Sequence, residues 1–145
     1  MDLPIKIKKL SEKAIIPDYK KRGDAGFDFH CIEEVALGPG ETGIVKTGLA
    51  FAIPEGYEMQ IRLRSGASLR TPLIIPNAPA TIDAGYRGEI GIIVRNIGQH
   101  PYTVAVNERI AQGIIAPVAR AIFDEVAELP ASERGAWGYG STGQD

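Results

Sequence analysis

The chain has one cysteine, Cys31, among its 145 residues, and it has no long apolar run. A single cysteine cannot form a disulfide within the chain, which favours a reducing compartment. Residues 1–10 contain no apolar core of signal-peptide length, and a membrane-spanning helix would need about 20 successive apolar residues. We therefore expect a cytoplasmic protein with no membrane partner.

The chain also lacks an excess of charge of either sign. Sixteen Lys and Arg residues stand against eighteen Asp and Glu residues, which gives a formal net charge of −2. Without a general positive field, we expect no binding of a nucleic acid polymer. Any recognition of phosphate must therefore be local.

Several known kinds of catalytic motif are missing as well. The sequence has no GxxxxGKS/T loop, no HExxH and no Cys/His spacing that would hold zinc. Its two histidines, His30 and His100, are far from any serine or cysteine nucleophile pattern. This argues against acyl-transfer chemistry.

Glycine and proline are plentiful, at 17 and 10 residues, and they recur between short β-branched stretches. This distribution favours an all-β domain, a sandwich or jelly roll. The clearest strand covers residues 57–64, where apolar and polar side chains alternate. Further strands are expected at residues 5–9, 43–53, 89–95, 102–106, 109–116 and 121–126. A helical turn is expected near residues 67–70, and residues 119–129 fit a helix about as well as a strand.

Residues 132–145 have the composition of a mobile arm that binds an anion, after a single β domain at residues 1–131. Four glycines allow successive N–H groups to point at one ligand. Arg134 adds a charge, Ser141 and Thr142 add hydroxyl groups, and Tyr139 adds a ring for stacking. The alternative is a disordered tail, which is the commoner fate of such a terminus when it stands alone.

Arg64, Ser65, Gly66 and Ser68 follow directly on the alternating strand. The arginine can bind two oxygens at once, and the hydroxyls and nearby N–H groups can donate to the same anion. The segment thus suits a phosphate. A plain exit from the strand with a capping serine is the alternative.

A second polar segment, residues 77–90, suits a sugar and a base. Asp83 lies between Ile82 and Ala84, so we expect it to be partly desolvated and able to accept a proton from water. Tyr86 adds a ring beside this carboxylate. The alternatives are a turn aspartate bonded to local N–H groups and a tyrosine in the core.

A third carboxylate, Asp28, lies between two phenylalanines. A carboxylate in apolar company needs a partner, which a hydrated Mg²⁺ escorting a polyphosphate would supply. A structural salt bridge to an arginine is the alternative. Arg109 and Gln112 share one polar edge further along the chain, and in isolation they indicate little.

Taken in order, residues 25–28, 64–66, 81–88, 109–112 and 134–143 resemble the five motifs of the trimeric dUTP pyrophosphatase (dUTPase) family. The resemblance spans nearly the whole chain. It implies a homotrimer of jelly-roll subunits, with active sites between subunits that are each completed by the arm of a neighbour. It also implies hydrolysis of dUTP to dUMP and pyrophosphate, which limits uracil incorporation into DNA and supplies dUMP for dTMP synthesis.

The resemblance further implies roles for single residues. Asp83 would activate the attacking water and accept the 3′-hydroxyl of the deoxyribose, and Tyr86 would pack under the sugar and exclude a 2′-hydroxyl. Backbone groups of the hairpin from Asn77 to Gly91, including those of Thr81 and Ile82, would read the uracil edge.

The remaining implied roles concern the triphosphate. Its oxygens would be bound by Arg64, Ser65, Gly66 and Gln112, and Asp28 would reach Mg²⁺ through water. In the arm, Tyr139 would stack on uracil, while the γ-phosphate would be covered by Arg134, Gly140, Ser141 and Thr142.

Three residues depart from the usual family pattern. Ala80 stands where glycine is usual before the Thr-Ile-Asp run, Trp137 stands at a position that is often glycine, and Tyr139 replaces the commoner phenylalanine. The tyrosine ring can still stack. Two other functions remain open, a deaminase acting on dCTP and a non-catalytic trimer that binds nucleotide. Asp83 and the complete arm argue against both.

Overall fold

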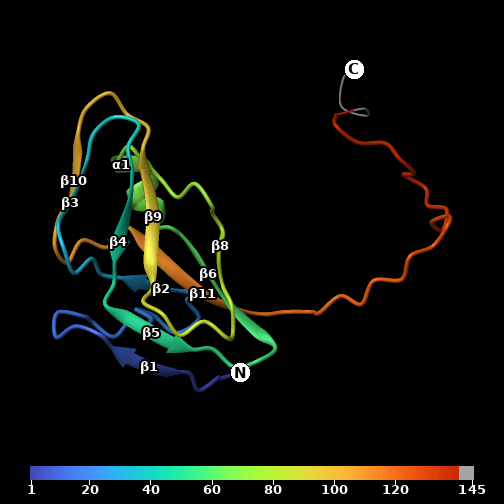
Figure 1. Cartoon of the computed structure of the whole chain (residues 1–145), viewed down its shortest axis with the longest axis horizontal. Helices are drawn as coiled ribbons and strands as arrows, with labels where there is room; N and C mark the ends of the chain where they lie inside the picture. Colours follow the sequence, from blue (N-terminus) through green and yellow to red (C-terminus); the bar gives the residue numbers. More distant parts are fainter. Residues whose placement is uncertain (141–145) are drawn as a thin grey trace.

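The computed structural model of the protein describes residues 1–140, so Ser141 and Thr142 lie outside the described residues. The described chain contains eleven strands and one helix. These are β1 (Lys6–Lys9), β2 (Gly26–Phe29), β3 (Val35–Leu37), β4 (Thr42–Lys46), β5 (Leu49–Ala52), β6 (Tyr57–Leu63), α1 (Ser65–Arg70), β7 (Leu73–Ile74), β8 (Ala80–Ile82), β9 (Gly91–Asn96), β10 (Tyr102–Val104) and β11 (Ala111–Pro117). The expected all-β fold is confirmed (Figure 1).

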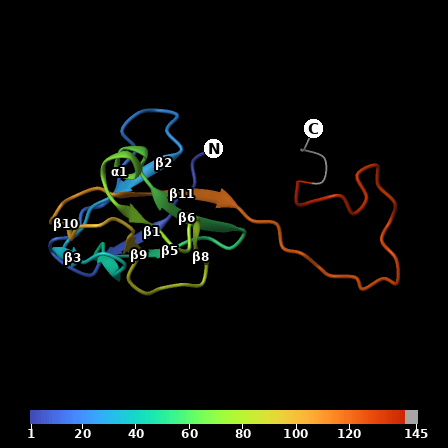
Figure 2. The ribbon, with the colours of Figure 1, turned by 90° about the horizontal axis from the view of Figure 1, so that it is seen from above.

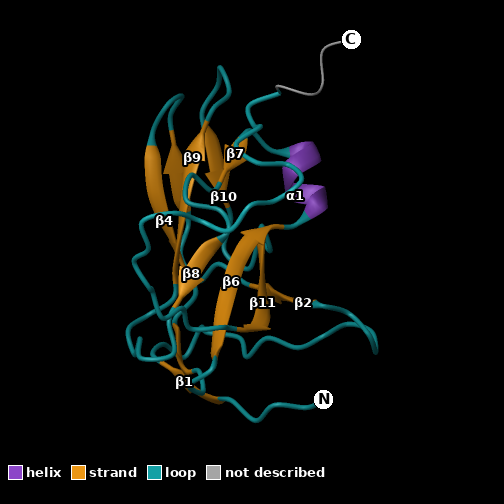
Figure 3. Ribbon diagram, turned by 90° about the vertical axis from the view of Figure 1, so that its right-hand side faces the viewer, coloured by secondary structure: helices purple, strands orange, loops and turns teal. Residues whose placement is uncertain are grey.

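The strands form two larger antiparallel sheets and two pairs. One sheet has the order β2-β11-β6-β8 and the other the order β4-β9-β7, while β1 pairs with β5 and β3 with β10. Strands distant in sequence are therefore neighbours, as a jelly-roll sandwich requires. In Figure 3, α1 lies just beyond the end of β6.

Most expected strands are present, with bounds shifted by one or two residues. The expected strand at residues 43–53 is instead two strands, because the chain bends at Thr47 and Gly48. The Thr47 hydroxyl donates to the carbonyl of Ile90 at 2.7 Å, and the N–H of Leu49 donates to that hydroxyl at 3.3 Å. Gly48 has a φ of +67°, which a side chain would disfavour.

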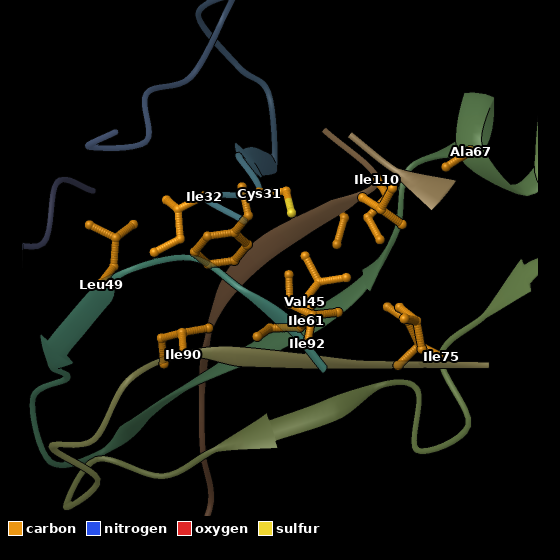
Figure 4. Packing of buried hydrophobic residues seen from close by; sticks show 14 of the residues in the cluster. Cys31, Ile32, Val45, Leu49, Ile61, Ala67, Ile75, Ile90, Ile92 and Ile110 are labelled. Carbon is orange, nitrogen blue, oxygen red and sulfur yellow. The ribbon is translucent and has the colours of Figure 1, made fainter. Parts of the chain in front are cut away.

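The core fills the space between the two larger sheets. Figure 4 shows Ile61 of β6, Val45 of β4 and Ile92 of β9 pointing toward one another. The predicted alternation of β6 is confirmed, since Met59 and Ile61 are fully buried while Arg62 is exposed. Cys31 is a buried free thiol, as a small core residue would be.

Gly113 in the middle of β11 has a packing reason. A Cβ at this position would lie 2.6 Å from the ring of Phe27 and 2.9 Å from that of Phe29. The two rings pack edge to face with centroids 5.5 Å apart. Only glycine therefore lets β11 pass over the aromatic cluster while pairing with β2 and β6.

The chain leaves the sandwich after β11, and residues 118–140 extend away from it (Figures 1 and 2). The strand expected at residues 121–126 is wrong, and so is the alternative helix over 119–129, because no element forms there. Ile122 is 95% exposed and Phe123 is 93% exposed, so these side chains lack the packing that would stabilise either structure. Within residues 1–140, no helix is long and apolar enough to span a membrane.

Tyr102 of β10 is hydrogen-bonded to the loop that joins β10 to β11. Its hydroxyl donates to Glu108 Oε1 at 2.9 Å. Burial, together with this bond to a carboxylate, raises the pKa of Tyr102 from 10.0 to about 12. The neutral phenol therefore stabilises the folded state fully below pH 10, and the contribution is lost as pH rises toward 12.

We predict that Tyr102→Phe lowers the free energy of unfolding by about 1 kcal/mol at pH 7. Urea unfolding at matched protein concentration measures this change, and the difference from the unsubstituted protein should shrink from pH 10 upward. Tyr19→Phe is the control, because the Tyr19 hydroxyl has no hydrogen bond within residues 1–140. A difference that grows at high pH would contradict the assigned role.

Candidate functional site

The end of β6 presents Arg64 at the start of α1. Its N–H donates to the carbonyl of Ile110 at 2.9 Å, and its Nη1 donates to the carbonyl of Arg109 at 2.9 Å. No side chain caps α1, so the alternative of a capping serine is wrong. The backbone N–H groups of the first helical turn are left without helical partners, as at any helix start.

Asp28 of β2 is the centre of a cationic cluster. Its Oδ1 lies 3.0 Å from Arg64 Nε, and its Oδ2 lies 3.4 Å from both Arg109 Nη1 and Lys20 Nζ. The side chain of Asp28 is only 16% exposed. The ion pair with arginine that the sequence left as an alternative is therefore present, with two arginines and one lysine.

The sheet register explains why these residues meet. β11 pairs with β2 on one side and β6 on the other, so Gln112 stands opposite both Asp28 and Arg62. Gln112 Nε2 donates to the carbonyl of Leu63 at 3.2 Å, which fixes the amide beside Arg64. Side chains from three segments far apart in the sequence are thereby brought to one place.

A cavity of about 320 Å³ lies at this cluster. It is lined by Asp18, Lys20, Asp24, Ala25, Gly26, Asp28, Arg64, Ser65 and Gln112. A Cβ at Gly26 would collide with the end of the Gln112 side chain, so glycine here lets the Gln112 amide keep its place in the wall. The lining combines cations, a hydroxyl and an amide, which is donor chemistry for phosphate oxygens.

His30, directly after β2, adds no positive charge to the cluster. Burial, reinforced by the charge of Arg109, lowers the pKa of His30 below 6.5 despite the opposing effect of Asp28. Within residues 1–140 its Nδ1 is buried without a hydrogen-bond partner. The imidazole is therefore neutral at pH 7, which leaves the arginines and the lysine as the cations here.

Asp83 and Tyr86 belong to a second cavity, in the hairpin that follows β8. β8 is the edge strand of its sheet and pairs with β6 through Met59 opposite Ile82. The cavity measures about 410 Å³ and is lined by Ile44, Lys46, Thr81, Ile82, Asp83, Tyr86, Glu89, Gly91 and Ile93. Asn77 does not line it.

The side chains of Asp83 and Tyr86 in this hairpin are both exposed to water. Asp83 is exposed, so the expected partial desolvation is wrong for the single chain, because an edge strand leaves its end in water. Tyr86 is also exposed, so the alternative of a core tyrosine is wrong. Its hydroxyl donates to the carbonyl of Glu89 at 2.8 Å, which holds the ring across the hairpin.

The carboxylate of Asp83 has no hydrogen bond within residues 1–140, although its backbone carbonyl accepts from the N–H of Tyr86 at 3.1 Å. The alternative of a turn aspartate whose side chain is bonded to local N–H groups is therefore wrong. The two oxygens remain available to a ligand or a water molecule.

The two cavities share no lining residue. Asp83 follows β8 beyond the Met59–Ile82 pair, whereas Arg64 follows the other end of β6. Arg64 is five residue steps along the chain from Met59, and at about 3.3 Å per step this is roughly 17 Å. One chain therefore does not bring Asp83 and Arg64 together.

The arm residues are also separate from both cavities. Arg134 Nε donates to the carbonyl of Trp137 at 2.7 Å, and the N–H of Gly135 donates to the hydroxyl of Ser132 at 3.1 Å. Tyr139 is fully exposed with a φ of +54°, and Gly140 has a φ of +77°. The described arm thus contains a local turn with its aromatic rings in water.

Sequence reasoning missed several lining residues, among them two lysines, Lys20 in the first cavity and Lys46 in the second. Neither belongs to a recognisable motif. The only signal for Lys20 is its closeness in the sequence to Asp24 and Asp28. Lys46 gave no signal, because its cavity position depends on the pairing of β4 with β9.

Comparison with known proteins places this geometry in a family. The family model described as dUTPase matches residues 12–143. A deoxyuridine 5′-triphosphate nucleotidohydrolase of Nautilia profundicola is 49% identical over 142 residues, which cover 98% of this chain and 100% of that protein. One of Clostridioides difficile is 47% identical over 139 residues, which cover 96% and 97%.

The fold has a close counterpart among solved structures. A dUTPase of Staphylococcus bacteriophage 80alpha, determined with dUPNHPP, superposes with a TM-score of 0.91 at 33% identity. The superposition covers 97% of this chain and 99% of that one. The similarity thus extends over the sandwich and most of the segment that follows it.

Proposed function

This chain belongs to the dUTPase family, and from that premise we propose that it hydrolyses dUTP to dUMP and pyrophosphate by attack of water on the α-phosphorus. The observation that supports this most directly is the hairpin cavity, where the unbonded carboxylate of Asp83 lies beside the ring of Tyr86. A carboxylate and a ring of this kind suit a deoxyribose with a water molecule next to it.

Asp83 orients and deprotonates the attacking water and accepts the 3′-hydroxyl of the sugar. Its oxygens are available because no other group in residues 1–140 uses them. Tyr86, fixed by its bond to Glu89, fills the space that a 2′-hydroxyl would need. Backbone groups of the hairpin, among them those of Asn77, Thr81, Ile82 and Gly91, contact the uracil edge.

The triphosphate binds in the cavity at Asp28. The Nε and Nη1 atoms of Arg64 are held by Asp28 and the Arg109 carbonyl, which leaves Nη2 as the donor for a ligand. Ser65 and Gln112 line the same wall, and the N–H of Gly66 is one of the free groups of the first turn of α1. Fixed donors of this kind stabilise charge that develops on phosphate oxygens.

Mg²⁺ fits this cavity when it enters bound to the triphosphate of the substrate, and not as a metal held by the protein alone. Within the described part of the chain, no three His, Cys, Asp or Glu side chains come close enough to hold a metal by themselves. Asp18, Asp24 and Asp28 nevertheless provide carboxylate oxygens on the wall, which is the donor type that hydrated Mg²⁺ prefers. When bound, the ion would neutralise phosphate charge, and Asp28 would contact it through water.

The active protein is a homotrimer whose sites lie between subunits. Two observations support this. First, Asp83 and Arg64 are roughly 17 Å apart along β6, so a single nucleotide needs the hairpin of one copy and the phosphate cavity of another. Second, the exposed side chains Ile122 and Phe123 suit an apolar cavity of about 500 Å³ near β1, lined in part by Ile5 and Ile7, on a neighbouring copy.

Residues 132–145 act as the arm that closes this site, following the β domain at residues 1–131. Arg134 leaves its local turn to bind the γ-phosphate, and Tyr139 stacks on uracil. Gly140 and the hydroxyls of Ser141 and Thr142 complete the cover. Closure excludes bulk water from the phosphates, and Trp137 adds a second ring to the cover. We place the protein in the cytoplasm, where its buried free thiol stays reduced.

Asp83→Asn should lower kcat for dUTP by about 10²–10⁴-fold or more while leaving the dissociation constant of dUTP within about threefold, because the amide cannot take the proton. Pyrophosphate release from dUTP, dTTP, dCTP and UTP, with Mg²⁺ present, measures rate and selectivity together. Glu55→Gln, in an exposed turn, is the control for charge removal. No release from any nucleotide by the unsubstituted protein would support a binding trimer instead, and formation of a uridine nucleotide from dCTP would support a deaminase.

Tyr86→Val should raise kcat/KM for UTP relative to dUTP by roughly tenfold, because it opens space beside the 2′ position. Tyr86→Phe keeps the ring and loses only the bond to Glu89, so it should retain the discrimination between the two sugars. Unchanged discrimination in Tyr86→Val would contradict the role of the ring.

Deletion of residues 134–145 should lower kcat by roughly 100-fold, because the arm makes its contacts on closure. The free energy of unfolding and the molar mass from light scattering should not change, because the described part of this segment is exposed. Deletion of residues 144–145 alone is the matched control, since it leaves the motif intact. A lower molar mass after deletion of residues 134–145 would show that the arm also holds the trimer together, which would contradict this prediction.

A further inference from the structure

Lys20 lies outside every motif considered above, yet it lines the phosphate cavity. It belongs to the loop that precedes β2, and its Nζ is 3.4 Å from Asp28 Oδ2. Its side chain is 52% exposed, in contrast to that of its carboxylate partner. The ammonium group is therefore anchored to the cavity at one point and otherwise in water.

The three cations at Asp28 are held to different degrees. Arg64 is fixed by two contacts, to Asp28 and to the carbonyl of Arg109. The backbone of Arg109 continues into β11, which pairs on both sides. Lys20 has only the contact to Asp28, on a loop without regular structure. The Arg109 side chain also contacts only Asp28, but its backbone lies next to a strand, so Lys20 is the cation that can move without losing another bond and without a strand beside it.

We propose that Lys20 is an additional triphosphate-binding residue, which pairs with Asp28 in the free protein and transfers to a phosphate oxygen when the nucleotide binds. This proposal rests on the proposed function, because the ligand is the triphosphate of that substrate. A lysine suits the transfer, since its ammonium is a compact charge on a flexible stem and needs no fixed geometry. The departure of Nζ leaves Oδ2 of Asp28 paired with Arg109 alone, so the carboxylate remains neutralised.

The surrounding charges favour such a transfer. Asp18 and Asp24 also line the cavity, but Asp24 Oδ2 already accepts from the N–H of Lys21 at 3.0 Å. A triphosphate carries more negative charge than the single Asp28 carboxylate and has many acceptor oxygens. It therefore competes well for an ammonium that one carboxylate holds at 3.4 Å.

The test is binding of dUTP to the Asp83→Asn protein, which prevents turnover, by isothermal titration calorimetry at fixed Mg²⁺. Adding Lys20→Met should raise the dissociation constant of dUTP on the order of tenfold. The dissociation constant of dUMP should change less than twofold, because dUMP lacks the β- and γ-phosphates. Added KCl should narrow the difference for dUTP, since salt screens an exposed charge.

Lys21→Met is the matched control, because Lys21 is exposed, does not line the cavity and has no ion pair within residues 1–140. It should change dUTP binding less than twofold. An equal loss in both variants would assign the effect to general charge, and no loss in Lys20→Met would show that the contact does not form. Either outcome would overturn the proposal.

Asp28→Asn separates direct binding from an effect on the carboxylate. If Lys20 contacts phosphate, Lys20→Met should still weaken dUTP binding in the Asp28→Asn protein. A loss that disappears in this background would reduce Lys20 to a residue that positions Asp28, and the proposal would fail. If Asp83→Asn alone binds neither dUTP nor dUMP, the proposed function itself fails, which is a distinct result.

Discussion

The double pairing of β11 is the constraint on which the rest of the structure depends. This strand runs antiparallel to β2 on one side and to β6 on the other. It can do so only because Gly113 leaves room for the rings of Phe27 and Phe29 beneath it. The same register sets Gln112 opposite Asp28 and brings the Arg64 end of β6 alongside. The packing of β11 thus determines both the aromatic part of the core and the position of the phosphate cavity.

Charge neutralisation at Asp28 follows from this arrangement. A carboxylate that is mostly buried must be paired, and here it is paired with three cations. A neutral His30 keeps the local charge from rising further. The protein as a whole has a net charge of −2, so its affinity for an anion depends on local groups such as this cluster and not on a general positive field.

The sequence predicted the parts of the fold that local patterns determine. The alternation in residues 57–64 predicted β6, because one face of that strand is buried and the other is not. It did not predict the bend at Thr47 and Gly48, where a side-chain hydrogen bond to a distant carbonyl decides the conformation. It also predicted a helix or a strand at residues 119–129, but the apolar side chains there have nothing to pack against in the described part of the chain. The motifs identified Asp28 and Arg64, whereas Lys20 was found only from its three-dimensional neighbours.

Trp137 is the only tryptophan of the chain, and it is 61% exposed in the segment that leaves the sandwich. The aromatic side chains of the core are phenylalanines, so tryptophan emission carries no direct signal from it. Unfolding of the sandwich would leave this indole in water, as it is in the folded single chain. The fluorescence of Trp137 therefore reports on the segment in which movement is expected. It can be separated spectrally from that of the tyrosines, and it gives no information about the core.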